Sequence, residues 1–174
     1  MKVLILCGGL GTRLAEETAL KPKPMVQIGQ KPILWHLIKY FKYYGLSDFI
    51  LATGYKSNII KDYFKKNKIN NCNVKVCFTG KDTLTGGRIL RLKKIIGDND
   101  FFVTYGDGVS NVNIRELIKF HNKHKGIVTL TAVRPPVRFG EIKISRKSKV
   151  FSFKEKPQAT HNWINGGFFI MRKE

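Results

Sequence analysis

The feature of this sequence that most constrains its fold is a regular alternation of short apolar runs with segments of helical periodicity. Apolar runs over residues 3–6, 49–53 and 101–105 predict buried strands. Between the first two, Ile33–Phe41 repeats apolar residues at helical spacing after a proline, and Gly45 follows, which predicts a helix. Strands and helices that alternate in this way form a mostly parallel sheet with helices on both faces. We therefore expect an α/β, Rossmann-like fold with a mostly parallel mixed sheet.

The same periodicities predict the other elements. We expect helices over residues 57–64 (capped by Ser57), 85–96 and 113–123, and strands over 74–78 and 127–133. Beyond Pro136 the pattern changes, because strand-like segments at 139–144, 150–155 and 164–171 follow one another without helices. The length of 174 residues suits a single domain. Its last part, residues 134–174, is expected to form antiparallel strands that act as a lid or floor for a second ligand.

The first strand leads directly into a glycine loop, Gly8–Arg13. Because glycine has no Cβ, the backbone of such a loop can approach a ligand and direct N–H groups at a phosphate. Lys21 and Lys23 then lie on a proline-stiffened segment that cannot be ordinary helix. A dinucleotide fingerprint would require glycine in place of Leu14, and the Gly-Lys-Ser/Thr ending of a triphosphatase loop does not follow. A turn that merely tolerates glycines is the alternative, but the nearby cations favour a polyphosphate site.

Asp107 closes a hydrophobic strand between two glycines. A carboxylate at such a strand end is costly unless it is paired, and the glycines permit a hydrated ion to approach it. Magnesium is usually held by one or two carboxylates together with substrate phosphates and water. Taken alone, Asp107 fits a turn residue; beside a polyphosphate loop, it is a candidate magnesium ligand.

Two segments near the carboxyl end indicate a second ligand. Glu155 and Lys156 are consecutive at a strand end, and they can share one ligand only if the strand is already turning, as Pro157 suggests. The alternative is a solvated charge pair. Gly140 and the Asn165 turn have the groups to hydrogen-bond sugar hydroxyls, although a tight turn alone also explains Asn165.

The formal net charge of +20 permits a nucleic-acid or anionic-membrane partner. The lysines are dispersed along the chain, however, so we expect neither nucleic acid nor membrane as a partner. No apolar run approaches membrane-spanning length and the chain opens on a core strand, from which we expect a cytoplasmic protein. The three cysteines lack paired spacing, which indicates neither a disulfide framework nor zinc. His121 and His124 share a predicted helix without a carboxylate or cysteine partner, so a solvated face is expected there.

Together these motifs resemble, in order and over essentially the whole chain, those of the sugar-phosphate nucleotidyltransferases, nearest to the cytidylyl branch. The segments that carry the resemblance are Gly8–Arg13, Lys21–Pro24, Thr85–Arg88, Gly106–Gly108, Phe139–Gly140, Glu155–Pro157 and Asn165–Gly167. The resemblance implies that a sugar 1-phosphate attacks the α-phosphate of a nucleoside triphosphate and expels pyrophosphate. CTP and glucose 1-phosphate would then give CDP-glucose, and Mg²⁺ would be the cofactor.

The resemblance also implies roles for individual residues. Arg13 would hold the β- and γ-phosphates, Lys23 the α-phosphate and Asp107 the magnesium. Nucleotide-binding residues would be Leu6, Gly8, Gly9, Gly11, Thr12, Arg13, Lys23, Thr85 and Arg88. Lys156 would bind the sugar phosphate, and Gly140, Glu155 and Asn165 the sugar. Residues 1–133 would form the nucleotide-binding part, and residues 134–174 the incomplete start of a sugar-binding part.

Two departures from the family pattern bear on activity. The family supplies a second metal-binding aspartate from a region beyond the equivalent of Glu174, so we expect a truncated chain with reduced or absent turnover, and a homo-oligomer only at full length. The connection from Val76 to Thr85 is shorter than in the cytidylyl branch, which leaves the base open. The alternatives are a family member with a different base and a non-catalytic nucleotide-binding remnant.

Overall fold

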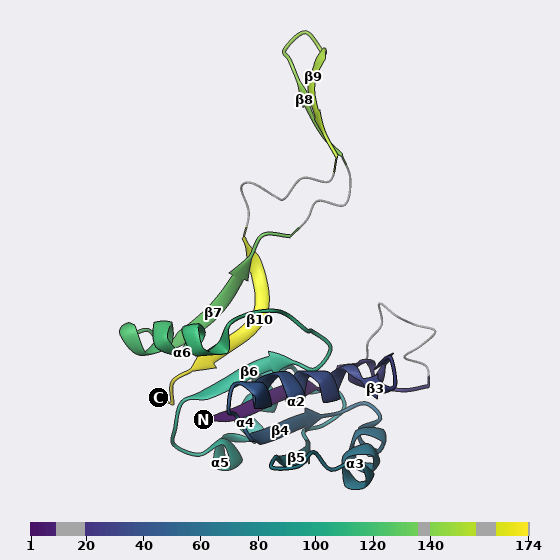
Figure 1. Cartoon of the computed structure of the whole chain (residues 1–174), viewed down its shortest axis with the longest axis vertical. Coiled ribbons are helices and arrows are strands. Elements are labelled where there is room, and N and C mark those ends of the chain that lie inside the picture. Colours follow the sequence, from purple (N-terminus) through teal and green to yellow (C-terminus); the bar gives the residue numbers. More distant parts are fainter. Residues whose placement is uncertain (10–19, 136–139, 156–162, 174) are drawn as a thin grey trace. The chain divides into compact units, whose positions relative to one another are not determined.

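The computed structural model describes residues 1–9, 20–135, 140–155 and 163–173, and its main feature is a six-stranded sheet (Figure 1). The strand order is β5-β4-β1-β6-β10-β7. β1 pairs in parallel with β4 and β6, β4 pairs in parallel with β5, and β10 runs antiparallel to β6. The strands are β1 (Lys2–Cys7), β4 (Asp48–Thr53), β5 (Asn73–Phe78), β6 (Phe101–Tyr105), β7 (Val128–Val133) and β10 (Ile164–Met171). The predicted α/β class with a mostly parallel mixed sheet is confirmed.

Helices bury apolar side chains against both faces of this sheet. On one face, α2 (Ile33–Tyr43), α3 (Ser57–Lys66) and α6 (Ile114–Lys123) contribute side chains to one apolar cluster with Val3 and Ile5 of β1. On the other, α4 (Thr85–Arg91) and α5 (Lys93–Ile96) pack against Leu4. Neighbouring residues of β1 therefore face opposite cores, which is why this strand is apolar at every position from Val3 to Cys7 rather than at alternate ones.

Two helix predictions differ in detail from the structure. The helix expected over residues 85–96 is interrupted at Leu92, whose φ of −99° and ψ of 3° end α4 and begin α5. Ser57 is not the cap of α3: the cap is Lys56, which adopts a left-handed φ of 50°. The Ser57 hydroxyl instead lies 2.6 Å from the Thr53 hydroxyl at the end of β4. The prediction of a Ser57 cap was therefore wrong.

The last strand belongs to the main sheet rather than to a separate layer. β10 inserts beside β6, with Phe168 opposite Thr104 and Met171 opposite Phe101. Phe168 and Ile170 are 2% and 0% exposed, and the Phe168 ring packs on Phe41. Burial of these apolar side chains accounts for the return of the chain to the sheet.

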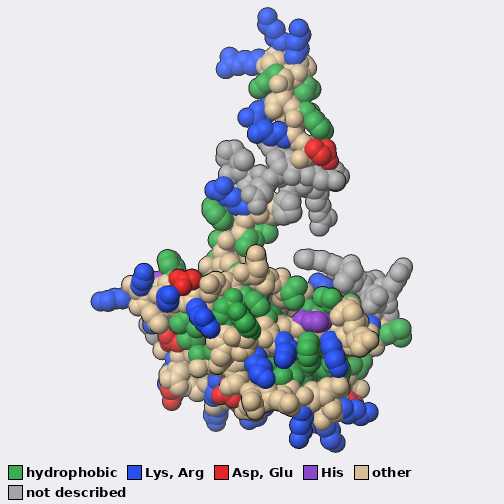
Figure 2. Space-filling view, in the orientation of Figure 1, with side chains coloured by type: hydrophobic (Ala, Val, Ile, Leu, Met, Phe, Trp, Pro, Cys, Tyr) green, Lys and Arg blue, Asp and Glu red, His purple; other side chains and the backbone are tan. Residues whose placement is uncertain are grey.

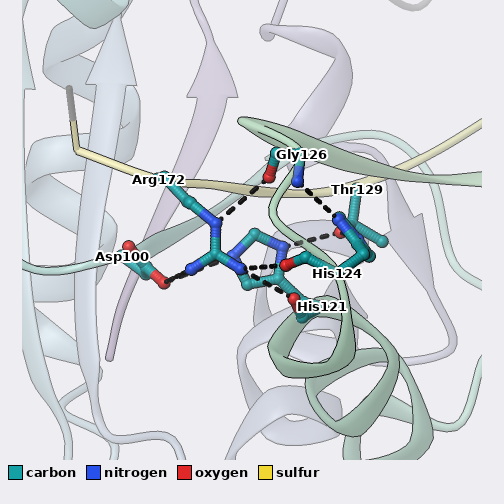
Figure 3. Close-up of polar contacts among 6 residues, drawn as sticks. All are labelled: Asp100, His121, His124, Gly126, Thr129 and Arg172. Atoms are coloured by element: carbon teal, nitrogen blue, oxygen red, sulfur yellow. Dashed lines mark hydrogen bonds and ion pairs between the residues drawn. The ribbon is translucent and has the colours of Figure 1, made fainter.

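A polar network lies near the amino-terminal end of β6, where it joins α6 to neighbouring segments (Figure 3). The Arg172 guanidinium donates to the carbonyls of His121, His124 and Gly126 and lies 3.4 Å from Asp100 Oδ2. His121, which is 0% exposed, contacts Asp100 Oδ2 at 3.2 Å and the Thr129 hydroxyl at 2.6 Å. The expectation that His121 lies on a solvated face was wrong, because its ring is buried and bonds to Asp100 and Thr129.

Residues 130–166 form a second compact unit, whereas the first contains residues 1–129 and 167–174. The second unit holds an antiparallel hairpin of β8 (Glu141–Ile144) and β9 (Val150–Lys154), as predicted, with a bulge between Lys143 and Ile144. The single-domain assignment and the boundary expected near residue 133 stay predictions.

The surface is basic and mixed. On the face drawn in Figure 2, Lys and Arg side chains are spread over the first unit and along the β8–β9 hairpin, with few acidic side chains between them. None of the helices in the described ranges combines the length and hydrophobicity needed to cross a bilayer.

Candidate functional site

The carboxyl ends of the parallel strands meet at one edge of the sheet, and an open pocket of about 330 Å³ lies there. Ligands of open α/β sheets bind at this edge, and a pocket of this size is within the range of small-molecule sites. Seven residues singled out from the sequence line it together: Leu6, Gly8, Gly9, Lys23, Thr85, Arg88 and Asp107.

Lys23 reaches the pocket from a short 3₁₀ turn, η2 (Lys23–Met25), which Pro22 precedes. The Met25 N–H donates to the Pro22 carbonyl at 2.7 Å, and Pro24 and Met25 are buried. The proline-stiffened segment expected here is therefore a tight turn anchored by two buried side chains. This anchoring fixes the backbone from which the ammonium group extends.

Asp107 follows β6 and forms an ion pair with Lys23, whose Nζ lies 2.6 Å from Asp107 Oδ2. Gly106 permits the segments to meet: a Cβ there would lie 2.8 Å from Cys7 Sγ and 3.0 Å from Pro24 Cγ. The Gly106 N–H also donates to the Leu6 carbonyl at 2.9 Å. A close backbone contact thus holds Asp107 beside the first strand and the lysine turn.

Arg88 extends from α4 into the floor of the pocket and is 5% exposed. Its Nη2 donates to the carbonyls of Gly8 at 3.0 Å and Lys81 at 3.1 Å. Its Nη1 faces Thr53 O at 3.2 Å, Thr79 Oγ1 at 2.7 Å and Gly80 O at 2.7 Å. Burial lowers the pKa of Arg88, but a guanidinium keeps its proton in proteins. The side chain therefore places a permanent charge beside Gly8 at the floor of the pocket.

Cys7 is buried at the end of β1, where burial, with a smaller contribution from Asp107, raises the pKa of its thiol. A thiol held in its protonated form is a poor nucleophile. Besides this thiol, the pocket contains the Lys23 ammonium, the Asp107 carboxylate and the buried charge of Arg88 beside Gly8, a set suited to binding and neutralising phosphates.

The pocket also has lining residues that the sequence reasoning did not assign to a site: Cys7, Pro24, Thr83, Leu84 and Tyr105. Three of them were adjacent in sequence to predicted site residues. Tyr105 ends a buried strand two residues before Asp107, yet it is 37% exposed. An aromatic side chain at the carboxyl end of such a strand was a usable signal.

Several predicted site residues are not among the described residues that line the pocket. Gly11, Thr12, Arg13 and Lys156 are outside the described residues. Gly140, Glu155 and Asn165 belong to the second unit, where a Cβ on Gly140 would lie 2.6 Å from the Phe153 ring and 3.4 Å from Glu155 Oε2. Their roles, and those of the pocket residues, stay predictions.

A magnesium ion fits the donor set at the pocket only with substrate oxygens as further ligands. Asp107 supplies one carboxylate, and no group of three metal-ligating side chains occurs within the described ranges. Magnesium commonly takes one or two carboxylates and completes its shell with phosphate and water. The residues present are compatible with an ion that binds together with a polyphosphate.

Known proteins are similar to this chain over almost its whole length. Residues 2–174 match the nucleotidyl transferase family. The chain is 44% identical to glucose-1-phosphate cytidylyltransferase of Salmonella typhimurium, over 98% of this chain and 75% of the relative. It is 33% identical to D-glycero-α-D-manno-heptose 1-phosphate guanylyltransferase of Campylobacter jejuni, over 100% of this chain and 77% of the relative.

A solved structure agrees with these relatives. HddC from Yersinia pseudotuberculosis, complexed with GMP-PN, is similar with a TM-score of 0.75 and 31% identity, over 98% of this chain and 76% of that one. The family match thus extends through both compact units. The chain therefore belongs to the nucleotidyl transferase family of enzymes, as a sugar-phosphate nucleotidyltransferase.

Proposed function

We propose that this chain transfers the cytidylyl group of CTP to glucose 1-phosphate, giving CDP-glucose and pyrophosphate. The observation that carries the proposal is the pocket in which Lys23 and Asp107 meet beside the glycines that follow β1. The 44% identity to a glucose-1-phosphate cytidylyltransferase supports the choice of base and sugar.

In the proposed reaction, an oxygen of the sugar 1-phosphate attacks the α-phosphorus of CTP. The bond between that phosphorus and the bridging oxygen to the β-phosphate breaks, and the electron pair leaves with pyrophosphate. No side-chain nucleophile is needed, because such transfers depend mainly on positioning and on neutralising charge. This agrees with a pocket whose cysteine is held as a thiol.

The chain's own residues would lower the repulsion between the two anionic substrates. Lys23 neutralises charge at the α-phosphate, and Arg13 at the departing phosphates. Amides of the glycine loop donate to phosphate oxygens. Asp107 would hold Mg²⁺, which when bound supplies positive charge to the phosphates. Gly140, Glu155, Lys156 and Asn165 would bind the sugar phosphate.

The test is pyrophosphate release with glucose 1-phosphate and each of CTP, GTP, UTP and ATP in turn. The proposal expects turnover with CTP and little with the others. Turnover only with GTP or UTP would overturn the assignment of the base. CTP binding measured by calorimetry, with no pyrophosphate released, would instead favour a non-catalytic nucleotide-binding domain.

A second candidate is transfer of a guanylyl group to a sugar 1-phosphate. It is favoured by two relatives, one named as a guanylyltransferase at 33% identity and one solved in complex with GMP-PN. Turnover with GTP but not with CTP in the same assay would favour this candidate.

A further inference from the structure

Arg88 is a buried cation whose bonds join three segments around the pocket. The Gly8 carbonyl follows β1, the Thr53 carbonyl ends β4, and Thr79, Gly80 and Lys81 follow β5. Four N–H groups on Nη1 and Nη2 face these five acceptors, so a phosphate could engage them only by displacing protein partners. The guanidinium is therefore committed to the protein rather than directed at a ligand.

The bond to Gly8 orients the next peptide group. The carbonyl and the N–H of a trans peptide point in opposite directions, and no cis peptide bond occurs in the described ranges. Because Gly8 O accepts from Arg88 at 3.0 Å, the N–H of Gly9 points away from the guanidinium. Gly9 is exposed and lines the pocket.

The same contact explains why residue 8 is glycine. A Cβ on Gly8 would overlap the guanidinium carbon and Nη1 of Arg88. Gly54, after β4, is similarly close, since a Cβ there would lie 2.8 Å from Arg88 Nη1 and 2.7 Å from Gly80 O. At Gly9, by contrast, a Cβ would meet nothing within 4 Å. The Arg88 side chain thus occupies the space that a Cβ at Gly8 or Gly54 would need.

The charge of Arg88 is stabilised mainly by the dipoles of neutral carbonyl and hydroxyl groups. Within the described part of the chain, the ion pairs found do not include Arg88. Five oxygens of carbonyl and hydroxyl groups surround its Nη1 and Nη2 instead. Dipoles stabilise a buried charge without cancelling it, so Arg88 still produces a positive potential at an anion in the adjoining pocket.

From this geometry we infer that Arg88 is a positioning residue for the triphosphate. It holds the Gly8 carbonyl so that the Gly9 amide is presented to the phosphates, and it adds positive potential from behind Gly8 without touching the nucleotide. The inference rests on the proposed function, because it assumes that a nucleoside triphosphate occupies this pocket.

The test compares Arg88→Lys, which keeps the charge but loses the planar fork, with Arg88→Met, which loses both. Arg91→Met is the matched control, because Arg91 lies on the same helix and donates to Thr79 O and Thr83 Oγ1 but does not line the pocket. Circular dichroism checks that each variant is folded. Calorimetry then measures the affinity for CTP and for CMP with Mg²⁺, or for the base that the turnover assay prefers.

We expect Arg88→Lys to weaken triphosphate binding about tenfold and Arg88→Met about a hundredfold, the scale of hydrogen bonds that involve a charged group. Arg91→Met should change it by less than about threefold, a difference within the range of ordinary surface substitutions. Binding of the monophosphate should fall less than that of the triphosphate in both Arg88 variants, because fewer phosphates meet the loop. A general collapse of the pocket would weaken the binding of CTP and of CMP by the same factor.

A second measurement tests the contact itself. Gly8→Ala should lower the melting temperature of the wild-type protein by at least about 4 °C but change that of Arg88→Met much less, because an untethered methionine can move aside. Gly9→Ala is the control and should have little effect in either background.

Equal losses of triphosphate affinity in Arg88→Met and Arg91→Met, or equal losses for CTP and CMP, would overturn the inference while leaving the proposed function in place. Additive melting-temperature changes of Gly8→Ala and Arg88→Met would overturn it as well. A folded wild-type protein that binds no nucleoside triphosphate would instead overturn the proposed function. If Arg88→Met does not fold, Arg88→Lys takes its place in the comparison of nucleotide affinities with Arg91→Met.

Discussion

The ion pair of Lys23 and Asp107 is a feature of the site rather than of stability. The two side chains are 29% and 31% exposed, and their charged atoms are 2.6 Å apart. Pairs with this much solvent contact contribute about 0–1 kcal/mol to folding. Each residue is instead fixed by its backbone, Lys23 by a turn with buried anchors and Asp107 by the close contact at Gly106.

The variant Lys23→Met should therefore lose activity without losing much stability. We expect turnover in the pyrophosphate assay to fall about a hundredfold, as when one positioned donor to a developing charge is removed. The free energy of unfolding, measured in urea, should change by less than about 1 kcal/mol.

The control is Lys31→Met, which removes a lysine of β3 (Lys31–Pro32) that does not line the pocket. Its turnover should stay close to that of the wild type. Full turnover in Lys23→Met would contradict the role assigned to this ammonium group.

The glycines show what sequence reasoning could and could not supply at this scale. It predicted that Gly8 and Gly9 belong to a ligand site, and the structure brings both to the pocket. The reason proposed for Gly8 was close approach of a ligand, whereas the observed neighbour is the Arg88 guanidinium. A partner eighty positions away on another element leaves no local pattern, so only the folded chain could reveal it.

Among the elements, helix α6 depends on a buried polar chain as well as on its apolar face. The Gly126 N–H donates to His124 Nδ1 at 2.9 Å, so His124 donates from Nε2 to the Thr129 hydroxyl at 2.7 Å. That hydroxyl can then donate to His121 Nδ1, and His121 Nε2 to Asp100. The order of donors accommodates a neutral His121 (Figure 3).

This order predicts a loss of stability in mild acid. Burial lowers the pKa of His121 below its ordinary value of 6.5; Arg172 and His124 add to the shift, and Asp100 opposes it. The unfolded chain therefore takes up this proton more readily than the folded one. Stability should be level above about pH 7 and fall as the pH drops from about 6.5 to about 5.

Urea unfolding across this pH range measures the effect. His121→Gln should flatten the pH dependence, whereas His36→Gln, at a partly exposed ring that contacts only the Ile28 carbonyl among the hydrogen bonds found, should preserve it. An equal slope in wild type and His121→Gln would rule out His121 as its source.

Most elements were predictable because each carries its own periodicity. The strands of the parallel sheet and helices α2 and α6 lie where their apolar patterns place them. The break at Leu92 and the return of β10 to the sheet were not predicted, since both depend on what the segment packs against. Leu92 is buried in the core between α4 and β4, and Phe168 is buried on α2.

At the scale of the whole molecule, the net charge of +20 destabilises the folded state through self-repulsion and attracts anions. Figure 2 shows the basic side chains distributed over the visible face with few acidic ones to offset them. Self-repulsion of this kind is long in range and is reduced by salt.

Raising salt from about 0.01 M to about 0.15 M shortens the Debye length from about 30 Å to about 8 Å. We expect the melting temperature to rise over this range, because repulsion within the folded state is screened. The affinity for CTP should fall over the same range, because attraction of the triphosphate is screened too. Scanning calorimetry and titration calorimetry on one preparation measure both, and a melting temperature that falls with added salt would contradict the electrostatic account.

The position of β10 also determines when the sheet can be completed during synthesis. β10 lies between β6 and β7, although its residues leave the ribosome after both. Until then the hydrogen-bonding edge of β6 stays open, and an open strand edge invites pairing with other chains. Without residues 164–171, the edge of β6 that faces away from β1 would lack its partner strand, so a chain cut short before β10 should associate through this edge.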